Sequence, residues 1–145
     1  MSLWQDQEFI DEKKGLQPCC FMTIWNVMGD KLNMKLIQRS SDHITAGSGI
    51  NEIQYCALLL MIAKATGYKP GLFIHDISNI HIYDRHIPIV KVVMNRTPIE
   101  CKPKLILDTD KTDFYSFTID DFRLEGYPLE EIKKKNPQVK LPLAI

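Results

Sequence analysis

The feature that most constrains the fold of this chain is an unbroken apolar run from Tyr55 to Ala63. Asn51 precedes the run as a candidate helix N-cap, and Gly67 follows it as a residue that ends helices in the left-handed conformation. The sequence therefore predicts a helix from Asn51 to about Thr66. Because its centre is apolar on every face, we expect this helix to be buried in a core. The run is far too short to cross a bilayer.

The segments around this helix have the composition of strands and turns. Gly29 and Asp30 suit a tight turn between two strand-like stretches, so they predict a hairpin. The segment 39–49 is small and polar and predicts a loop, residues 84–94 fit a strand or a helix, and residues 133–135 are expected in a polar loop. The expected strands are Cys20–Met28, Leu32–Ile37, Phe73–Tyr83, Leu105–Leu107 and Phe114–Phe122. Together these elements predict an α+β fold in which a mixed sheet packs against the long hydrophobic helix.

Length and composition indicate one soluble globular domain that covers residues 1–145. The chain is 45% hydrophobic and 25% charged, which is enough apolar material for one ordinary core. Its 18 basic and 18 acidic residues cancel, and this balance argues against broad electrostatic binding of nucleic acid or of an anionic membrane. Four cysteines without a C-x-x-C pair predict reduced thiols in a cytoplasmic protein.

Two short segments carry candidate groups for chemistry, and each has a structural alternative. Cys19 follows a proline just before a strand, where a catalytic nucleophile often stands, but a buried apolar cysteine fits the same position. Arg39 and Ser40 suit a phosphate clamp, because a guanidinium can bond two oxygens at once. With Asp42 close by, the alternative is a surface ion pair that contributes little.

The histidines do not predict a metal site, because no pair has strong ligand spacing together with a companion cysteine or carboxylate pattern. They are His43, His75, His81 and His86. His81 and Tyr83 are two residues apart, so on a strand they face the same side. They fit a pair of hydrogen-bonding groups for a polar ligand and an ordinary sheet face equally well.

A series of short motifs runs in one order along nearly the whole chain. The motifs are Leu-Gln-Pro-Cys19, Gln38-Arg-Ser-x-Asp42, Asn51-x-x-x-Tyr55, Met-Ile-Ala63-x-x-Thr-Gly67, Pro-Gly71-x-Phe-Ile-His75, His81-Ile-Tyr83 and Pro-Leu-Ala-Ile145. Each motif alone is weak, whereas the ordered series is highly specific. In this series the chain resembles the thymidylate synthases, and the resemblance covers the C-terminal part of that longer enzyme.

The resemblance implies a homodimeric α+β enzyme that converts dUMP to dTMP. It implies 5,10-methylenetetrahydrofolate as co-substrate, which supplies the carbon and the hydride, and no metal. Cys19 matches the nucleophile that adds to C6 of uracil, and Arg39 and Ser40 match the groups that bind the phosphate. Arg39 lies beside the thiol in the family, where a cation favours the thiolate. Asn51 matches the amide that pairs with O4 and N3–H of uracil, since a carboxamide both donates and accepts.

The other matched positions concern the ribose and the folate. His81 and Tyr83 match the pair that holds the ribose hydroxyl. Asp42 matches the carboxylate that binds the pterin, and Ile145 matches the C-terminus that closes over bound folate and excludes water. Cys20 departs from the family pattern, which commonly has histidine at this position.

The resemblance leaves two alternatives to a working thymidylate synthase. The family's N-terminal part carries a phosphate-binding arginine loop, a proton-transfer glutamate and a folate-pocket tryptophan that this sequence lacks, so we expect slow turnover or none. The first alternative is a pyrimidine deoxynucleotide hydroxymethylase, although Asn51 argues against a cytosine substrate. The second is a non-catalytic nucleotide-binding or dimerisation module with the same fold.

Overall fold

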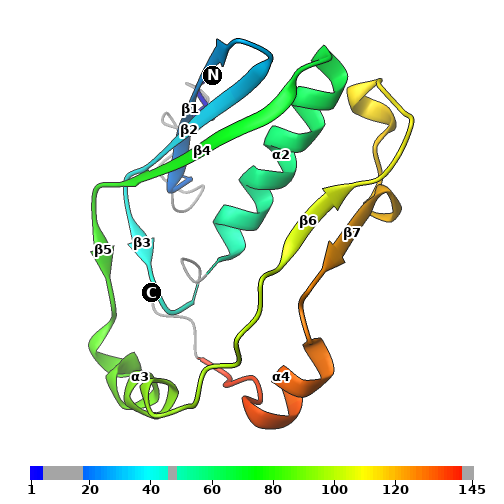
Figure 1. Ribbon diagram of the computed structural model, residues 1–145. Helices are drawn as coiled ribbons and strands as arrows, with labels where there is room; N and C mark the ends of the chain where they lie inside the picture. The colour runs from blue at the N-terminus through cyan, green and yellow to red at the C-terminus, as the bar shows by residue number, and fades with distance from the viewer. Residues whose placement is uncertain (5–17, 46–48, 142–145) are drawn as a thin grey trace.

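The computed structural model describes residues 1–4, 18–45 and 49–141 and shows a mixed α/β arrangement (Figure 1). The strands are β1 (Cys20–Met28), β2 (Lys31–Gln38), β3 (Ser41–Asp42), β4 (Lys69–Ile77), β5 (Ile80–His81), β6 (Lys104–Leu107) and β7 (Phe122–Glu125). The α-helices are α2 (Ile50–Thr66), α3 (Ile87–Met94) and α4 (Leu129–Lys135). Short 3-10 turns cover Asp84–His86, Phe114–Ser116 and Ile119–Asp121.

The main sheet has three strands in the order β1-β2-β4. β1 and β2 form an antiparallel hairpin around Gly29, whose φ of 62° lies in the left-handed region that glycine adopts without strain. β2 and β4 pair in parallel, and the chain reaches β4 from β2 by way of α2. The predicted hairpin and the predicted mixed sheet are therefore confirmed.

The core lies between this sheet and α2, as Figure 1 shows. β2 alternates strictly, so that every second side chain is buried. The buried apolar residues of the core are Leu32, Met34, Leu36, Tyr55, Leu59 and Ala63. A fully buried aliphatic side chain contributes roughly 1.5–3 kcal/mol to stability. In the core, every second side chain of β2 packs against the side of α2 on which every fourth residue is buried.

α2 is less enclosed than its composition predicts. Its buried residues form a single stripe, Tyr55, Leu59 and Ala63, whereas Ile53 on another side is 62% exposed. The expectation of burial on every face is thus met along one stripe only. The packing of α2 against β2, β4 and β6 covers that stripe and part of its flanks.

The two ends of α2 test the predicted helix signals. Gly49 is the N-cap with φ 100°, and its carbonyl oxygen accepts from the Ile53 backbone N–H at 3.0 Å. The prediction that Asn51 caps the helix is therefore wrong, and Asn51 lies within the first turn with its side chain free for other contacts. Gly67 ends the helix in the left-handed conformation, as predicted.

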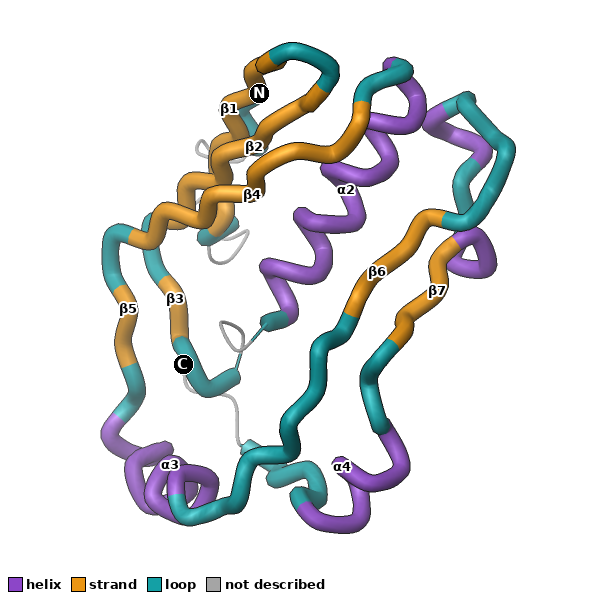
Figure 2. Tube along the Cα trace, in the orientation of Figure 1, coloured by secondary structure: helices purple, strands orange, loops and turns teal. Residues whose placement is uncertain are grey.

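The predicted strand Phe73–Tyr83 is two strands in two different sheets. A bend at Ser78 and Asn79 separates β4 from β5. β5 pairs in parallel with β3, which lies inside the segment predicted as a loop. Figure 2 shows β3 and β5 running side by side away from the main sheet. This small second sheet carries the His81 region beside the segment that follows β2.

The structure also decides three further segments: one predicted strand is wrong, one is confirmed, and the segment with two possible conformations is helical. The predicted strand Phe114–Phe122 is two 3-10 turns, because the Asp113 carboxylate accepts from the Tyr115 N–H and the Asp121 carboxylate accepts from the Thr118 N–H. β7 begins only at the end of that segment and pairs with β6, which confirms the strand predicted at 105–107. The ambiguous residues 84–94 are helical.

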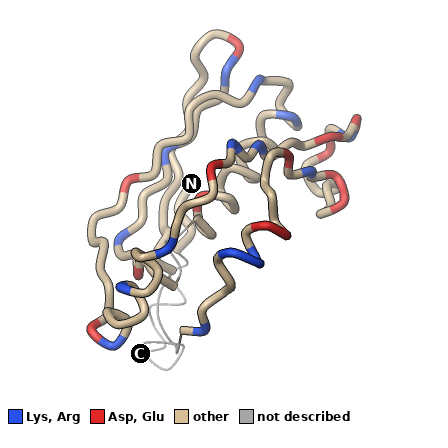
Figure 3. Tube along the Cα trace, turned by 60° about the horizontal axis from the view of Figure 1, so that its bottom comes forward, with Lys and Arg blue, Asp and Glu red and all other residues tan. Residues whose placement is uncertain are grey.

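The lysine triplet at 133–135 ends α4 and is not in a loop, contrary to the prediction. Lys133 and Lys135 pair with Glu130 and Glu131 at 2.9 and 2.7 Å, three and four residues earlier on the helix surface. Figure 3 shows Lys and Arg interspersed with Asp and Glu along the described trace. Across the described ranges, the structure has no helix that is both long and apolar enough to traverse a bilayer. All four cysteines are free thiols.

Candidate active site

A cavity of about 470 Å³ opens where β1 begins, β2 ends and α2 starts. Its volume lies within the range of small-molecule sites. The lining residues are Pro18, Cys19, Cys20, Gln38, Arg39, Ser40, Asp42, Asn51, Gln54, Tyr55, His81 and Tyr83. All the site residues predicted from the sequence line this cavity, apart from Ile145, which lies outside the described residues. The structure thus brings together groups that are up to 64 positions apart, from 19 to 83.

Cys19 and Arg39 are neighbours because β1 and β2 are paired at this end of the sheet. The Arg39 backbone N–H donates to the Cys19 carbonyl oxygen at 2.9 Å. A bulge between Cys20 and Met22 shifts the register just inside this pair, and such bulges re-aim the side chains beside them. The Cys19 thiol is exposed at the cavity, so an approaching ligand can reach it.

Asp42 lines the same cavity, and its carboxylate is hydrogen-bonded to residues that follow it in the chain. It accepts from the Ile44 backbone N–H at 3.2 Å and from the Thr45 hydroxyl. Burial alone would raise the pKa of the Asp42 carboxyl, but hydrogen bonds from the Thr45 side chain and from the Ile44 and Thr45 backbone hold it below its ordinary value. Asp42 therefore offers the cavity an ionised hydrogen-bond acceptor, as a ligand with N–H donors requires.

His81 reaches the cavity from β5, and Tyr83 reaches it from just before the 3-10 turn Asp84–His86. His81 is the Cα partner of Asp42 in the β3–β5 pairing, which places the two side by side. The rings of His81 and Tyr83 meet edge to face with centroids 5.0 Å apart. His81 Nδ1 is buried and has no hydrogen-bond partner among the described residues. His81 as a residue lines the cavity, and its ring therefore has hydrogen-bonding capacity that the described residues do not use.

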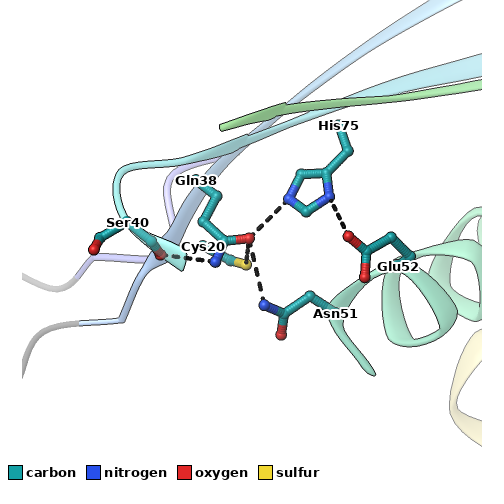
Figure 4. Close-up of polar contacts among 6 residues, drawn as sticks. All are labelled: Cys20, Gln38, Ser40, Asn51, Glu52 and His75. Carbon is teal, nitrogen blue, oxygen red and sulfur yellow. Dashed lines mark hydrogen bonds and ion pairs between the residues drawn. The ribbon is translucent and has the colours of Figure 1, made fainter. Parts of the chain in front are cut away.

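Asn51 faces the cavity from the first turn of α2 and is tied to a buried glutamine. Its Nδ2 lies 3.3 Å from Oε1 of Gln38, a side chain that is only 1% exposed at the end of β2. Gln38 also accepts from the Cys20 thiol at 3.4 Å. Figure 4 shows this cluster, together with His75 and Glu52.

The sequence reasoning did not assign a role to Gln38, His75 or Glu52. One signal could have pointed to Gln38, because it continues the inward positions of an alternating apolar strand, where a polar residue needs a partner. His75 is on β4, the neighbouring strand in the same sheet, and Glu52 follows Asn51 on α2. Nothing local indicates that these three meet.

Cys20 behaves differently from its neighbour Cys19. Burial raises the pKa of the Cys20 thiol to about 11, and the nearby Cys19 and Glu52 add to this effect, while a hydrogen bond with Tyr55 opposes it. Burial likewise raises the pKa of Tyr55 to about 12. Cys20 therefore keeps its proton at neutral pH and acts as a hydrogen-bond donor, whereas the nucleophilic form of cysteine is the thiolate.

The described residues show no group of three or more metal-ligating side chains that could hold an ion. What the cavity holds instead is a reachable thiol, a cation, a carboxylate, a carboxamide and a histidine–tyrosine pair. This set is suited to a polar, anionic ring compound that is attacked by the thiol.

Comparison with known proteins finds one family that matches nearly the whole length of the chain. A family profile described as thymidylate synthase matches residues 1–144. The thymidylate synthase of Streptococcus agalactiae is 43% identical over 150 residues, which cover 100% of this chain and 51% of that protein. The thymidylate synthase of Clostridium beijerinckii is 41% identical over 140 residues, with 96% of this chain and 52% of the relative covered.

Solved structures give the same result. The thermostable thymidylate synthase A from Bacillus subtilis superposes with a TM-score of 0.76 at 35% sequence identity, covering 99% of this chain and 48% of that one. The chain thus spans about half the length of the relatives that it matches. Within that span both the sequence and the arrangement of the elements are shared, and the chain belongs to the thymidylate synthase family.

Proposed function

We propose that the chain is the C-terminal catalytic part of a thymidylate synthase, which methylates dUMP to dTMP. The observation that carries this proposal is the cavity in which the exposed Cys19 thiol, Arg39 and Asn51 meet. Arg39 and Ser40 bind the nucleotide phosphate, and His81 and Tyr83 hold the ribose hydroxyl. Asn51 pairs with the edge of the uracil ring, and Asp42 binds the pterin of the folate.

The reaction begins when the Cys19 sulfur, as a thiolate, bonds to C6 of uracil. The electron pair of the C5–C6 double bond moves to C5, which becomes a carbon nucleophile. Asn51 donates to O4, where part of the negative charge gathers, and Arg39 favours the thiolate form of Cys19. When bound, 5,10-methylenetetrahydrofolate supplies the one-carbon unit and the hydride. Loss of the C5 proton and departure of the Cys19 sulfur restore the ring double bond.

The test is covalent capture with 5-fluoro-dUMP and 5,10-methylenetetrahydrofolate, read by denaturing mass spectrometry. Because fluorine at C5 cannot leave as a proton does, a competent site traps both molecules on the protein. We expect an adduct on the 145-residue chain that disappears in Cys19→Ser and persists in Cys101→Ser, whose thiol lies outside the cavity. Nucleotide binding without capture would instead indicate a non-catalytic binding module.

We also propose that the chain forms a homodimer through the face of the main sheet that points away from α2. On that face Ile24, Lys35 and Ile74 are cross-strand neighbours, and Ile24 and Ile74 are each 50% exposed. Leu72, two residues along β4, is 66% exposed. Three large aliphatic side chains on one face are typical of an interaction surface.

Sedimentation equilibrium tests the dimer. We expect a mass of two chains for the wild type and one chain for Ile74→Lys. The new lysine lies beside Lys35, which already pairs with Asp76 at 2.8 Å, so the added charge would be buried without a partner of its own. A wild-type chain that stays monomeric at concentrations up to about 100 μM, a Kd worth roughly 5.5 kcal/mol, would overturn this proposal.

A further inference from the structure

The cluster around Gln38 has a fixed direction of hydrogen bonding. Gln38 Nε2 donates to the Ser40 carbonyl oxygen at 2.8 Å (Figure 4). A backbone carbonyl can only accept, so the amide group of Gln38 must face it. Oε1 of Gln38 consequently points to the other side, where it can only accept.

This direction determines the orientation of the groups around Gln38 Oε1. His75 Nε2 lies 2.8 Å from that oxygen, so His75 must carry a hydrogen on Nε2. Asn51 must likewise present its amide group to the same oxygen, at 3.3 Å. The Asn51 carbonyl oxygen therefore points away from Gln38, as Figure 4 shows.

Glu52 closes the chain of contacts at the far side of the His75 ring. Its Oε1 lies 2.8 Å from His75 Nδ1, and the His75 side chain is only 10% exposed. One proton lies between these two atoms. Since Nε2 already carries a hydrogen, either a doubly protonated ring donates from Nδ1 to a carboxylate, or a carboxyl group donates to Nδ1 of a neutral ring. Either arrangement keeps the hydrogen on Nε2 that Gln38 requires. Without Glu52, a neutral ring can carry its hydrogen on Nδ1 instead and turn a lone pair toward Gln38 Oε1.

We propose that Glu52 is a positioning residue that makes this cavity select uracil over cytosine nucleotides. Through His75 it supports the Gln38 orientation that the Ser40 carbonyl also requires, and so helps to hold the Asn51 amide in the orientation that uracil needs. In that orientation the Asn51 carbonyl oxygen accepts from N3–H, and its second amide hydrogen donates to O4. This inference rests on the proposed function, in which Asn51 meets the pyrimidine edge.

Cytosine presents the opposite pattern, an acceptor at N3 and an amino donor at C4. To pair with it, Asn51 would have to turn its amide over, which sets its carbonyl oxygen against Gln38 Oε1. Two facing acceptors leave both without a hydrogen bond, and a buried unsatisfied polar group is costly. The network therefore disfavours cytosine without touching it.

The first test reads the His75 ring directly, without nucleotide, by long-range ¹H–¹⁵N correlation NMR. We expect Nε2 to be protonated in the wild type and in Glu52→Gln, whose amide can donate to Nδ1. Glu52→Leu should instead show a population with the hydrogen on Nδ1. A wild-type ring with bare Nε2, or a Glu52→Leu ring identical to the wild type, would overturn the proposal.

The second test measures the dissociation constants of dUMP and dCMP by calorimetry on the same variants. We expect the preference for dUMP to fall roughly tenfold in Glu52→Leu and to stay within about threefold in Glu52→Gln. Ile53→Ala, at the next and exposed helix position, is the matched control and should keep the wild-type preference. An unchanged preference in a folded Glu52→Leu chain would refute the selectivity.

The two tests separate this inference from the proposed function. A wild-type chain that binds neither nucleotide at millimolar concentration would overturn the proposed function and, with it, the uracil selectivity. The NMR result would still decide whether Glu52 orients the ring. A chain that prefers dUMP in every variant would leave the proposed function intact and remove Glu52 from the explanation.

Discussion

Two polar clusters in this molecule show how a network that serves a cavity differs from one that serves the fold. The first, the Gln38 network, contains Cys20, Gln38, Asn51, Glu52 and His75 and joins β1, β2, β4 and α2. The second, the Asp121 cluster, contains Lys111, Thr118 and Asp121 and lies before β7. Hydrogen-bonded partners in the first are up to 37 positions apart, whereas those in the second are at most ten positions apart.

The Asp121 cluster is closed on itself. Oδ2 of Asp121 accepts from the Thr118 backbone N–H at 2.7 Å, from the Thr118 hydroxyl at 3.1 Å and from Lys111 Nζ at 2.8 Å. The hydrogen bonds from Lys111 and Thr118 hold the pKa of the Asp121 carboxyl well below its ordinary value. Every donor in this cluster meets the one carboxylate, so it stabilises a turn and offers nothing to a ligand.

The Gln38 network, in contrast, ends in atoms that are left over. The Asn51 carbonyl oxygen points away from Gln38, and Glu52 Oε2 is buried with no hydrogen-bond partner among the described residues. A buried polar atom without a partner weakens a fold, so this network, unlike the Asp121 cluster, is not arranged for stability alone. Substitutions in the two clusters test this difference.

The largest effect is expected for Gln38→Leu. The change removes the acceptor of His75, Asn51 and Cys20 and the donor to Ser40, and places an apolar side chain among these half-buried polar groups. We expect the free energy of unfolding to fall by about 2–3 kcal/mol and the binding of dUMP to be lost. Urea unfolding and calorimetry measure the two quantities.

The matched control is Gln54→Leu, which makes the same chemical change at an exposed position of the cavity wall. Its unfolding free energy should stay within about 0.5 kcal/mol of the wild type. Equal losses in the two variants would show that Gln38 is not the centre of a buried network.

A smaller effect that depends on pH is expected for Asp121→Asn. Since the pKa of Asp121 is lowered in the folded chain, its ionised form contributes stability above its ordinary pKa of 3.8, and this contribution is lost as the pH falls below that value. At pH 7 we expect the Tm to fall by roughly 3–6 °C, with little effect on nucleotide binding. The difference from the wild type should shrink below about pH 4.

The smallest effect is expected for Lys111→Met, because the Lys111 side chain is 42% exposed and water screens its pairing with Asp121. The Tm should fall by no more than about 2 °C, which scanning calorimetry can resolve. A loss as large as that of Asp121→Asn would mean that the ion pair, and not the turn, dominates this cluster.

Much of the fold was predictable because its signals are local. The hairpin at Gly29 and the helix end at Gly67 follow from the backbone freedom of glycine, and both were confirmed. The prediction at 114–122 failed because the side chains of Asp113 and Asp121 bond to nearby backbone N–H groups and stabilise turns in residues with strand-like composition. The prediction for Asn51 failed because Gly49 takes the capping position.

The candidate site was predictable only in part. The ordered motifs predicted Cys19, Arg39, Asn51 and the other candidate site residues, and those within the described ranges line one cavity. Their roles remain predictions. The motifs did not indicate that His75 and Glu52 join the hydrogen-bond network of Asn51 and Gln38. Neither the alternation of β4 nor the apolar run of α2 carries that information. Both depend on how a parallel strand and a helix are set side by side.

The amino-acid sequence was sufficient for the hairpin at Gly29, the helix end at Gly67 and the family, because each depends on residues close together in the chain or on the order of motifs. The tertiary structure alone decided which polar side chains meet, and therefore the direction of the hydrogen bonds at Gln38. The reason is geometric: a hydrogen bond acts within about 3 Å, whereas its partners here come from four elements whose distance along the chain says nothing about their contact. The orientation of Asn51, on which the proposed uracil selectivity depends, is a property of that packing.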